Sequence, residues 1–190
     1  MKRFCCALLI AALVTPVALA QTYSGELTND CLTATGDWTE DTKIEWQVVN
    51  MTTYWQYTYC FTANRKGLSH IAIELTPPSN DFTPEIYDFE ISHDGENWGP
   101  GTYEQKLQEA DQPSNQGLPE DFYGIKVNCN GNDEPNGLPV LDLDENGDCD
   151  FFCFRFKSVQ NPMWGDFYAR DGIDEELKEF VYVYNNGFAS

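Results

Sequence analysis

The sequence has few basic residues, 11 lysines and arginines against 31 aspartates and glutamates, which gives a net charge of −20 at pH 7. A charge this negative repels nucleic-acid phosphates and anionic lipid surfaces, so no nucleic acid is expected among the partners. Cations, basic proteins and neutral sugars remain compatible with it. The same acidity also suits an exported protein that only has to stay soluble.

No stretch after residue 20 is apolar and long enough to cross a bilayer. The first twenty residues instead have the organisation of a secretory signal peptide: basic Lys2 and Arg3, an apolar run over Cys5–Val14, and the small-residue exit Ala18-Leu19-Ala20. We expect cleavage after this exit, an uncleaved anchor being the alternative. The secreted, extracellular chain is then residues 21–190, with a net charge of −22 because nine basic residues face 31 acidic ones.

Motifs of common hydrolases are missing as well, since neither G-x-S-x-G nor H-E-x-x-H occurs. His70, one of two histidines, follows Ser69, but neighbouring residues of a strand point to opposite faces and are poorly placed to act as nucleophile and base. The remaining catalytic alternative is a secreted carbohydrate-active hydrolase that uses a carboxylate pair. Nothing singles out such a pair among the acids, so no catalytic residue is assigned.

Amphipathic helical patterns are nearly absent, whereas alternating patterns recur. Ile44, Trp46 and Val48 alternate with polar residues, which is typical of a strand with one buried face. A single short helix is expected over Ile173–Glu179, and residues 96–121 are expected to form a long surface loop with one helical turn near residues 103–110. Strands are expected at residues 43–49, 54–63, 71–75, 85–92, 123–128, 138–143, 151–157, 166–170 and 180–184.

This pattern predicts an all-β fold. We expect an antiparallel β-sandwich of about eight or nine strands with one short helix near the C-terminus, and a closed barrel is the alternative. No internal repeat and no linker rich in serine, threonine or proline divides residues 21–190. A single domain is therefore expected after the signal peptide of residues 1–20.

Residues 21–190 contain five cysteines, an odd number that predicts two disulfides and one free or intermolecular thiol. Proximity along the chain favours Cys31 with Cys60, and Cys129 with Cys149 or Cys153, although sequence does not fix the connectivity. The odd thiol leaves the oligomeric state open.

An acidic segment with a calcium-loop pattern spans residues 142–150. Its D-x-D-x-N-G core places oxygen ligands at alternate positions and a glycine at the sharp turn. The twelfth position is Cys153 rather than glutamate and no helix is expected on either side, so a complete EF-hand is excluded. The alternative is a two-residue hairpin turn at Asn146-Gly147 with solvated acids. The candidate Ca²⁺ ligands are Asp142, Asp144, Asn146, Asp148 and Asp150.

The sequence contains more aromatic residues than one sheet face must bury. The core is expected to contain Trp46 and Trp55, whereas Trp98 and Trp164 lie among glycines and prolines that indicate surface loops. Aromatic rings stack on the apolar faces of sugars, so Trp98, Tyr103 and Trp164 are the candidate ligand-binding residues.

Three segments recur in one order along the chain: Tyr57-Thr58-Tyr59 leading into Gly67-Leu68-Ser69-His70-Ile71, then Gly124-Ile125-Lys126, then Phe154-Arg155-Phe156 leading to Gly165-Asp166 and Asp171-Gly172. In this the chain resembles a loose group of secreted, surface-associated proteins, many of them bacterial and carrying C-terminal sorting anchors. The resemblance implies a β-rich extracellular domain and supplies no catalytic residues. The hydrophobic sorting tail of the anchored members is not found in this sequence.

Together these features predict a secreted, acidic, non-catalytic binding module or extracellular-matrix component. Its expected partner is a glycan or an extracellular protein surface, and Ca²⁺ is the candidate cofactor.

Overall fold

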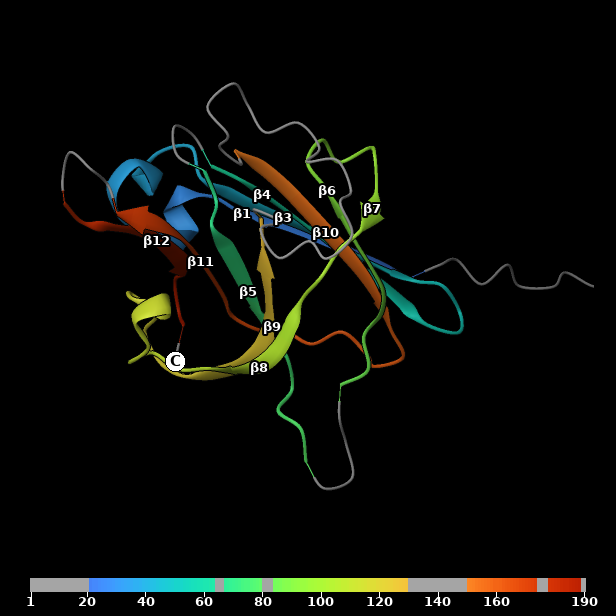
Figure 1. Cartoon of the computed structure of the whole chain (residues 1–190). Helices are drawn as coiled ribbons and strands as arrows, with labels where there is room; N and C mark the ends of the chain where they lie inside the picture. The colour runs from blue at the N-terminus through green and yellow to red at the C-terminus, as the bar shows by residue number, and fades with distance from the viewer. Residues whose placement is uncertain (1–20, 64–66, 80–83, 130–149, 174–177, 189–190) are drawn as a thin grey trace, which may run out of the picture.

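The computed structural model describes residues 21–63, 67–79, 84–129, 150–173 and 178–188, and it contains two antiparallel sheets of six strands each (Figure 1). Sheet A has the strand order β1-β3-β4-β10-β6-β7, and sheet B has the order β2-β12-β11-β5-β9-β8. The strands are β1 (Thr22–Leu27), β2 (Leu32–Ala34), β3 (Lys43–Asn50), β4 (Trp55–Thr62), β5 (His70–Glu74), β6 (Tyr87–Ser92), β7 (Gly99–Pro100), β8 (Glu104–Gln108), β9 (Phe122–Asn128), β10 (Phe151–Ser158), β11 (Phe167–Ile173) and β12 (Phe180–Asn185).

The two sheets share one large hydrophobic core, which confirms the all-β, sandwich-like prediction. Sheet A contributes Ile44, Phe61 and Phe154, and sheet B contributes Ile71 and Ile125, all of them buried. The alternation of apolar and polar residues therefore identifies the side of each strand that faces the core. The described residues form twelve strands rather than eight or nine, because the short or polar strands at the sheet edges carry little apolar alternation.

The outer face of sheet B is covered by the connection between β8 and β9. Leu118 from this connection forms a second buried cluster with Ala72, Phe122 and Tyr168. The Tyr168 hydroxyl donates a hydrogen bond to the backbone oxygen of Gln116 at 2.7 Å. This connection packs on the sheet, and β5 is buried on both of its faces as a result.

One expectation about local structure is wrong, and the expected helix falls mostly on residues outside the described ones. Residues 104–108, expected in a surface loop with a helical turn, form the edge strand β8, which pairs with β9 along its whole length. The unpaired backbone groups of β9 supply hydrogen bonds that outweigh the weak local preference of this polar segment. No α-helix occurs in the part of the chain that the structure describes: Ile173 ends β11, and Lys178 has a left-handed backbone with φ of 60°. Residues 174–177 of the expected helix, and the strand expected at residues 138–143, lie outside the described residues.

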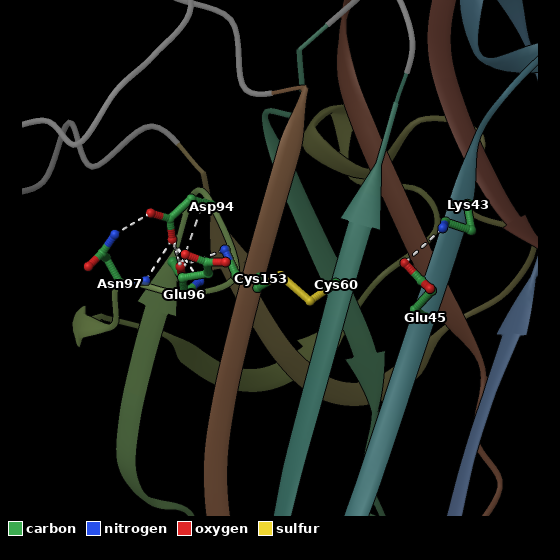
Figure 2. The surroundings of a disulfide bond; sticks show 9 residues. Lys43, Glu45, Cys60, Asp94, Glu96, Asn97 and Cys153 are labelled. Atoms are coloured by element: carbon green, nitrogen blue, oxygen red, sulfur yellow. Dashed lines mark hydrogen bonds and ion pairs between the residues drawn. A yellow bond between two sulfur atoms is a disulfide. The ribbon is translucent and has the colours of Figure 1, made fainter.

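The disulfide connectivity also differs from the expected one. Cys60 is bonded to Cys153, and not to Cys31 (Figure 2). These two cysteines lie directly opposite each other on β4 and β10, with a Cα–Cα distance of 4.1 Å, so the strand register brings them together although 93 positions separate them in the chain. Proximity in sequence was a poor guide because the pairing of β4 with β10 is long-range.

The Cys60–Cys153 bond also limits the pairing of the other cysteines. Cys31 is a free, exposed thiol next to the edge strand β2. Cys129 is disulfide-bonded, and the Cys129–Cys153 alternative is excluded because Cys153 bonds Cys60. Cys149, the other expected partner of Cys129, lies outside the described residues.

In the described residues, no helix is long and apolar enough to pass through a bilayer.

Candidate functional site

A cavity of about 310 Å³ opens between the two sheets, along the inner face of β1, β3 and β4. Its walls are mainly aromatic and aliphatic, and they end at the connection that carries the chain from β10 in sheet A to β11 in sheet B. We call this cavity the aromatic groove. The side chains that define it here are Tyr23, Trp46, Tyr57, Tyr59, Glu74, Met163, Trp164 and Asp166.

The β10–β11 connection, residues 159–166, forms the rim of the groove. Met163 and Trp164 are 74% and 85% exposed, the two highest values among the large hydrophobic residues of the described chain. A second cavity of about 160 Å³ adjoins the other side of these residues and shares Tyr57, Tyr59 and Glu74 with the groove. Met163 and Trp164 therefore stand between two hollows and present apolar surface to both.

Side chains of the neighbouring strands fix the rim. The Trp55 indole Nε1 donates to Asn161 Oδ1 at 3.2 Å, and the Tyr57 hydroxyl donates to the backbone oxygen of Gln160 at 3.0 Å. Burial raises the pKa of Tyr57 to about 12, so its hydroxyl keeps the proton that it donates. The rim is thus anchored at its β10 end, and the exposed Trp164 follows directly after the anchored part.

Trp46 lies at the floor of the groove because β1 leaves room for it. A Cβ atom added to Gly25 would lie 2.4 Å from the Trp46 ring, so the indole rests directly on the glycine backbone. The rings of Trp46 and Trp164 meet edge to face with centroids 5.9 Å apart, a favourable arrangement for an aromatic pair. Trp46 on the inner face of β3 and the exposed Trp164 of the β10–β11 connection therefore form one aromatic pair in the wall of the groove.

Two carboxylates bring polar atoms into this apolar setting. Glu74 Oε2 accepts a hydrogen bond from the backbone N–H of Asp166 at 2.9 Å, and Asp166 Oδ1 accepts one from Asn185 Nδ2 at 2.6 Å. Gly165 allows the close approach, since a Cβ atom there would lie 3.2 Å from Glu74 Cβ. The arrangement offers aromatic faces and hydrogen-bond acceptors side by side.

The structure separates the three candidate ligand-binding residues. Trp164 lines the groove. Trp98 lies over the guanidinium group of Arg155 at 4.2 Å on the outer face of sheet A. Tyr103 packs on Phe89 with ring centroids 4.8 Å apart, and its hydroxyl donates to the backbone oxygen of Ile86 at 3.2 Å. Trp98 and Tyr103 therefore have structural partners, and neither lines the aromatic groove.

Trp46 and Tyr59 also line the groove, and neither is among the predicted ligand-binding residues. Both lie on the inward side of alternating strands, where a core position is the ordinary expectation. Burial raises the pKa of Tyr59, and the neighbouring Tyr57 adds to this shift, so this hydroxyl too stays protonated. The available signal was the excess of large aromatics on β3 and β4 over what one inner face must bury.

Of the five candidate calcium ligands, Asp150 alone lies in the part of the chain that the structure describes. Asp142, Asp144, Asn146 and Asp148 lie outside the described residues. Asp150 precedes β10, and its backbone oxygen accepts a hydrogen bond from Ala63 N at 2.8 Å. Within the described ranges, no three His, Cys, Asp or Glu side chains are grouped so that they could hold a metal ion.

Comparisons with known proteins add little to this geometry. No protein-family model and no curated protein matches the chain. One solved structure matches over 80% of this chain and 86% of its own, with 9% sequence identity and a TM-score of 0.29: the KRT10-binding region domain of the pneumococcal serine-rich repeat protein PsrP.

Proposed function

We propose that this chain is a secreted, non-catalytic binding module that holds a glycan in the aromatic groove. The observation that carries the proposal is the exposure of Trp164, a residue that is 85% accessible at the rim of an aromatic cavity. Exposing this ring to water is unfavourable, whereas stacking it on a ligand removes its apolar surface from water. The signal-peptide pattern of residues 1–20 supports an extracellular site of action.

Sugars suit this combination of groups. A pyranose ring has an apolar face of C–H groups that stacks on indole and phenol rings, and a rim of hydroxyls that donate to carboxylates. Trp46 and Trp164 supply the faces, and Glu74 and Asp166 supply the acceptors. The cavity of about 310 Å³ is at the small end of ligand sites, which favours one or two sugar rings over a long chain.

A glycan array probed with the purified protein tests this proposal. We expect binding to a defined set of neutral glycans, and at least a tenfold loss of affinity for Trp164→Ala, because an exposed indole that stacks on a ligand is a typical hot spot. Trp98→Ala is the matched control, since it removes the same side chain from the opposite face of sheet A. No binding by the wild type, or equal binding by Trp164→Ala, would contradict the proposal.

The hydrolase alternative makes a different prediction for the same groove. Glu74 and Asp166 both line it, but each carboxylate accepts a hydrogen bond from the protein itself. We expect no turnover of chromogenic glycosides by the wild type. Turnover that is lost in Glu74→Gln would replace the binding module with a carbohydrate-active enzyme.

We also propose that Ca²⁺ stabilises the acidic segment of residues 142–150, on the strength of its D-x-D-x-N-G pattern. A cation bound only by the folded state raises the melting temperature by mass action. We expect millimolar CaCl₂ to raise the melting temperature of the wild type, and to leave Asp142→Asn/Asp144→Asn unchanged. An equal response to MgCl₂ and CaCl₂ in both proteins would rule out a specific site.

A further inference from the structure

Most basic side chains of the described residues are paired with carboxylates. Arg155 contacts Glu90 at 2.7 Å and Lys157 contacts Asp88 at 2.8 Å. Lys126 differs, since it is half-buried and no carboxylate lies within ion-pair distance of it in the described ranges. An unpaired, half-buried ammonium group is unfavourable, and in a chain of net charge −20 it is unexpected.

Lys126 belongs to a cluster on the outer face of sheet B. The cluster comes from four neighbouring strands: Arg170 from β11, His70 from β5, Lys126 from β9 and Lys106 from β8. We call these four residues the basic patch. His70 lies opposite Arg170 on one side and opposite Asn128 on the other. The alternation of the strands puts Lys126 on the same face as Asn128, two positions away.

His70 lies at the centre of the basic patch with a hydrogen-bonding atom unused. The residue is 5% exposed, and its Nε2 is buried without a hydrogen-bond partner among the described residues. Burial, together with the charges of Lys126, Arg170 and Lys106, lowers the pKa of His70 to about 3. Buried polar atoms are normally satisfied, so the unused Nε2 requires a hydrogen-bond partner, and in the Nε2–H tautomer that partner is an acceptor.

The surrounding groups neutralise this charge only in part. Glu104 on β8 lies opposite Lys126 in the strand register and attracts it, but the ion pair that Glu104 forms is with Lys106. Arg170 donates from Nη1 to the backbone oxygen of Pro113 at 2.7 Å and from Nε to that of Asp171 at 3.1 Å, so its charge faces carbonyls. The acids of the covering β8–β9 connection are all exposed: Glu109, Asp111, Glu120 and Asp121.

We propose that the basic patch is a binding site for a sulfate or phosphate group. The ammonium group of Lys126, the Nε2–H tautomer of His70 and the side-chain amide of Asn128 would donate to its oxygens, and such charge-assisted bonds are the strong ones. Asn128 is exposed, so the patch opens to solvent at that end. The chain's overall negative charge excludes polyanions and leaves a single small oxyanion, free or carried as an ester on a sugar.

Histidine-ring NMR tests the site directly, because the chain has only two histidines. Sodium sulfate is titrated at low millimolar concentration against sodium chloride at equal ionic strength. The His70 ring nitrogens should shift saturably, and those of His93, which follows β6 of sheet A, should not. Lys126→Gln should weaken the apparent affinity at least tenfold, the loss expected for a charged hydrogen bond. Lys43→Gln, which removes a lysine paired with Glu45 on sheet A, should leave it unchanged.

Further titrations with sugars identify the source of the oxyanion. A 6-sulfated monosaccharide that binds more tightly than sulfate indicates a sulfated glycan, and equal affinities indicate the free ion. The unsulfated parent sugar should cause no shift at His70, whatever happens at the aromatic groove. Lys126→Arg should retain binding, which shows that a loss in Lys126→Gln reflects charge and not misfolding. The absence of a saturable His70 shift, or equal shifts in wild type and Lys126→Gln, would overturn the proposal.

Discussion

Residues of the same type perform different roles here because their surroundings differ. Trp164 is exposed at the groove, Trp98 covers a guanidinium group, and Trp46 lies half-buried on a glycine. Their neighbours along the chain indicate a loop or a strand, but not the partner of each ring. Gly25 lies opposite Trp46 on β1, and the indole occupies the space that a side chain at this position would fill.

Gly25→Ala should damage the groove. The new Cβ would lie 2.4 Å from the Trp46 ring, so the indole must move, and overpacking of this kind costs about 1–3 kcal/mol of unfolding free energy. We expect a changed tryptophan fluorescence spectrum, a lower denaturation midpoint and loss of glycan binding. Gly99→Ala, on the edge strand β7, is the control, because nothing lies within 4 Å of its added Cβ. Identical behaviour of the two variants would show that Gly25 does not position Trp46.

His70 should make the protein sensitive to acid. Its pKa is about 3 in the folded state, lowered by burial and nearby cations, against about 6.5 in the unfolded chain. The unfolded state therefore binds the extra proton below pH 6.5, and stability falls by about 1.4 kcal/mol per pH unit down to pH 3. Guanidinium denaturation in chloride buffers at pH 7 and pH 4 measures this. His70→Gln should lose less stability over that interval than the wild type, and equal losses would contradict the assignment.

Strands with a clear buried face were predictable, and edge strands were not. β3, β4, β5, β9 and β10 were expected near their observed positions because their alternation is a local property of the sequence. β8 was expected as loop because Glu104–Gln108 is polar, and it becomes a strand only through pairing with β9. A disulfide depends on register between two strands, which no local pattern specifies.

Removing the Cys60–Cys153 bond should be costly. The bond joins neighbouring strands across 93 positions of sequence, and closing a loop of that length in the unfolded chain contributes about 3–5 kcal/mol to stability. Cys60→Ala/Cys153→Ala should lower the unfolding free energy by this amount in guanidinium denaturation. Cys31→Ser should have little effect because Cys31 is exposed and free. A destabilisation by Cys31→Ser that equals that of the double variant would contradict the connectivity.

Charge governs the behaviour of the whole molecule. With 31 acidic and 11 basic residues, repulsion between carboxylates opposes the compact state, while surface ion pairs such as Lys43–Glu45 add little. Two regions depart from this acidic average: the aromatic groove, which is apolar, and the basic patch on the outer face of sheet B. The groove opens between the two sheets and the basic patch lies on the outer face of sheet B, so the two proposed sites are separate.

Added salt should therefore stabilise the protein. Raising NaCl from ~0.01 to ~0.5 M shortens the screening length from about 30 Å to a few ångströms and removes most of the repulsion. We expect a melting temperature that rises with NaCl by several degrees, measured by calorimetry. A flat or falling curve would mean that attractive ion pairs, and not net repulsion, dominate.

The sequence by itself determined that the chain folds into strands, which strand faces point inward, and how strongly the chain is charged, because these depend on neighbouring residues and composition. Tertiary structure alone decided that Cys60 meets Cys153, that Trp164 faces a cavity while Trp98 does not, and that Lys126 gathers with His70 and Arg170. Each of these contacts joins segments far apart in the chain. The free energy that selects them comes from packing two whole sheets together, and no short stretch of sequence contains that information.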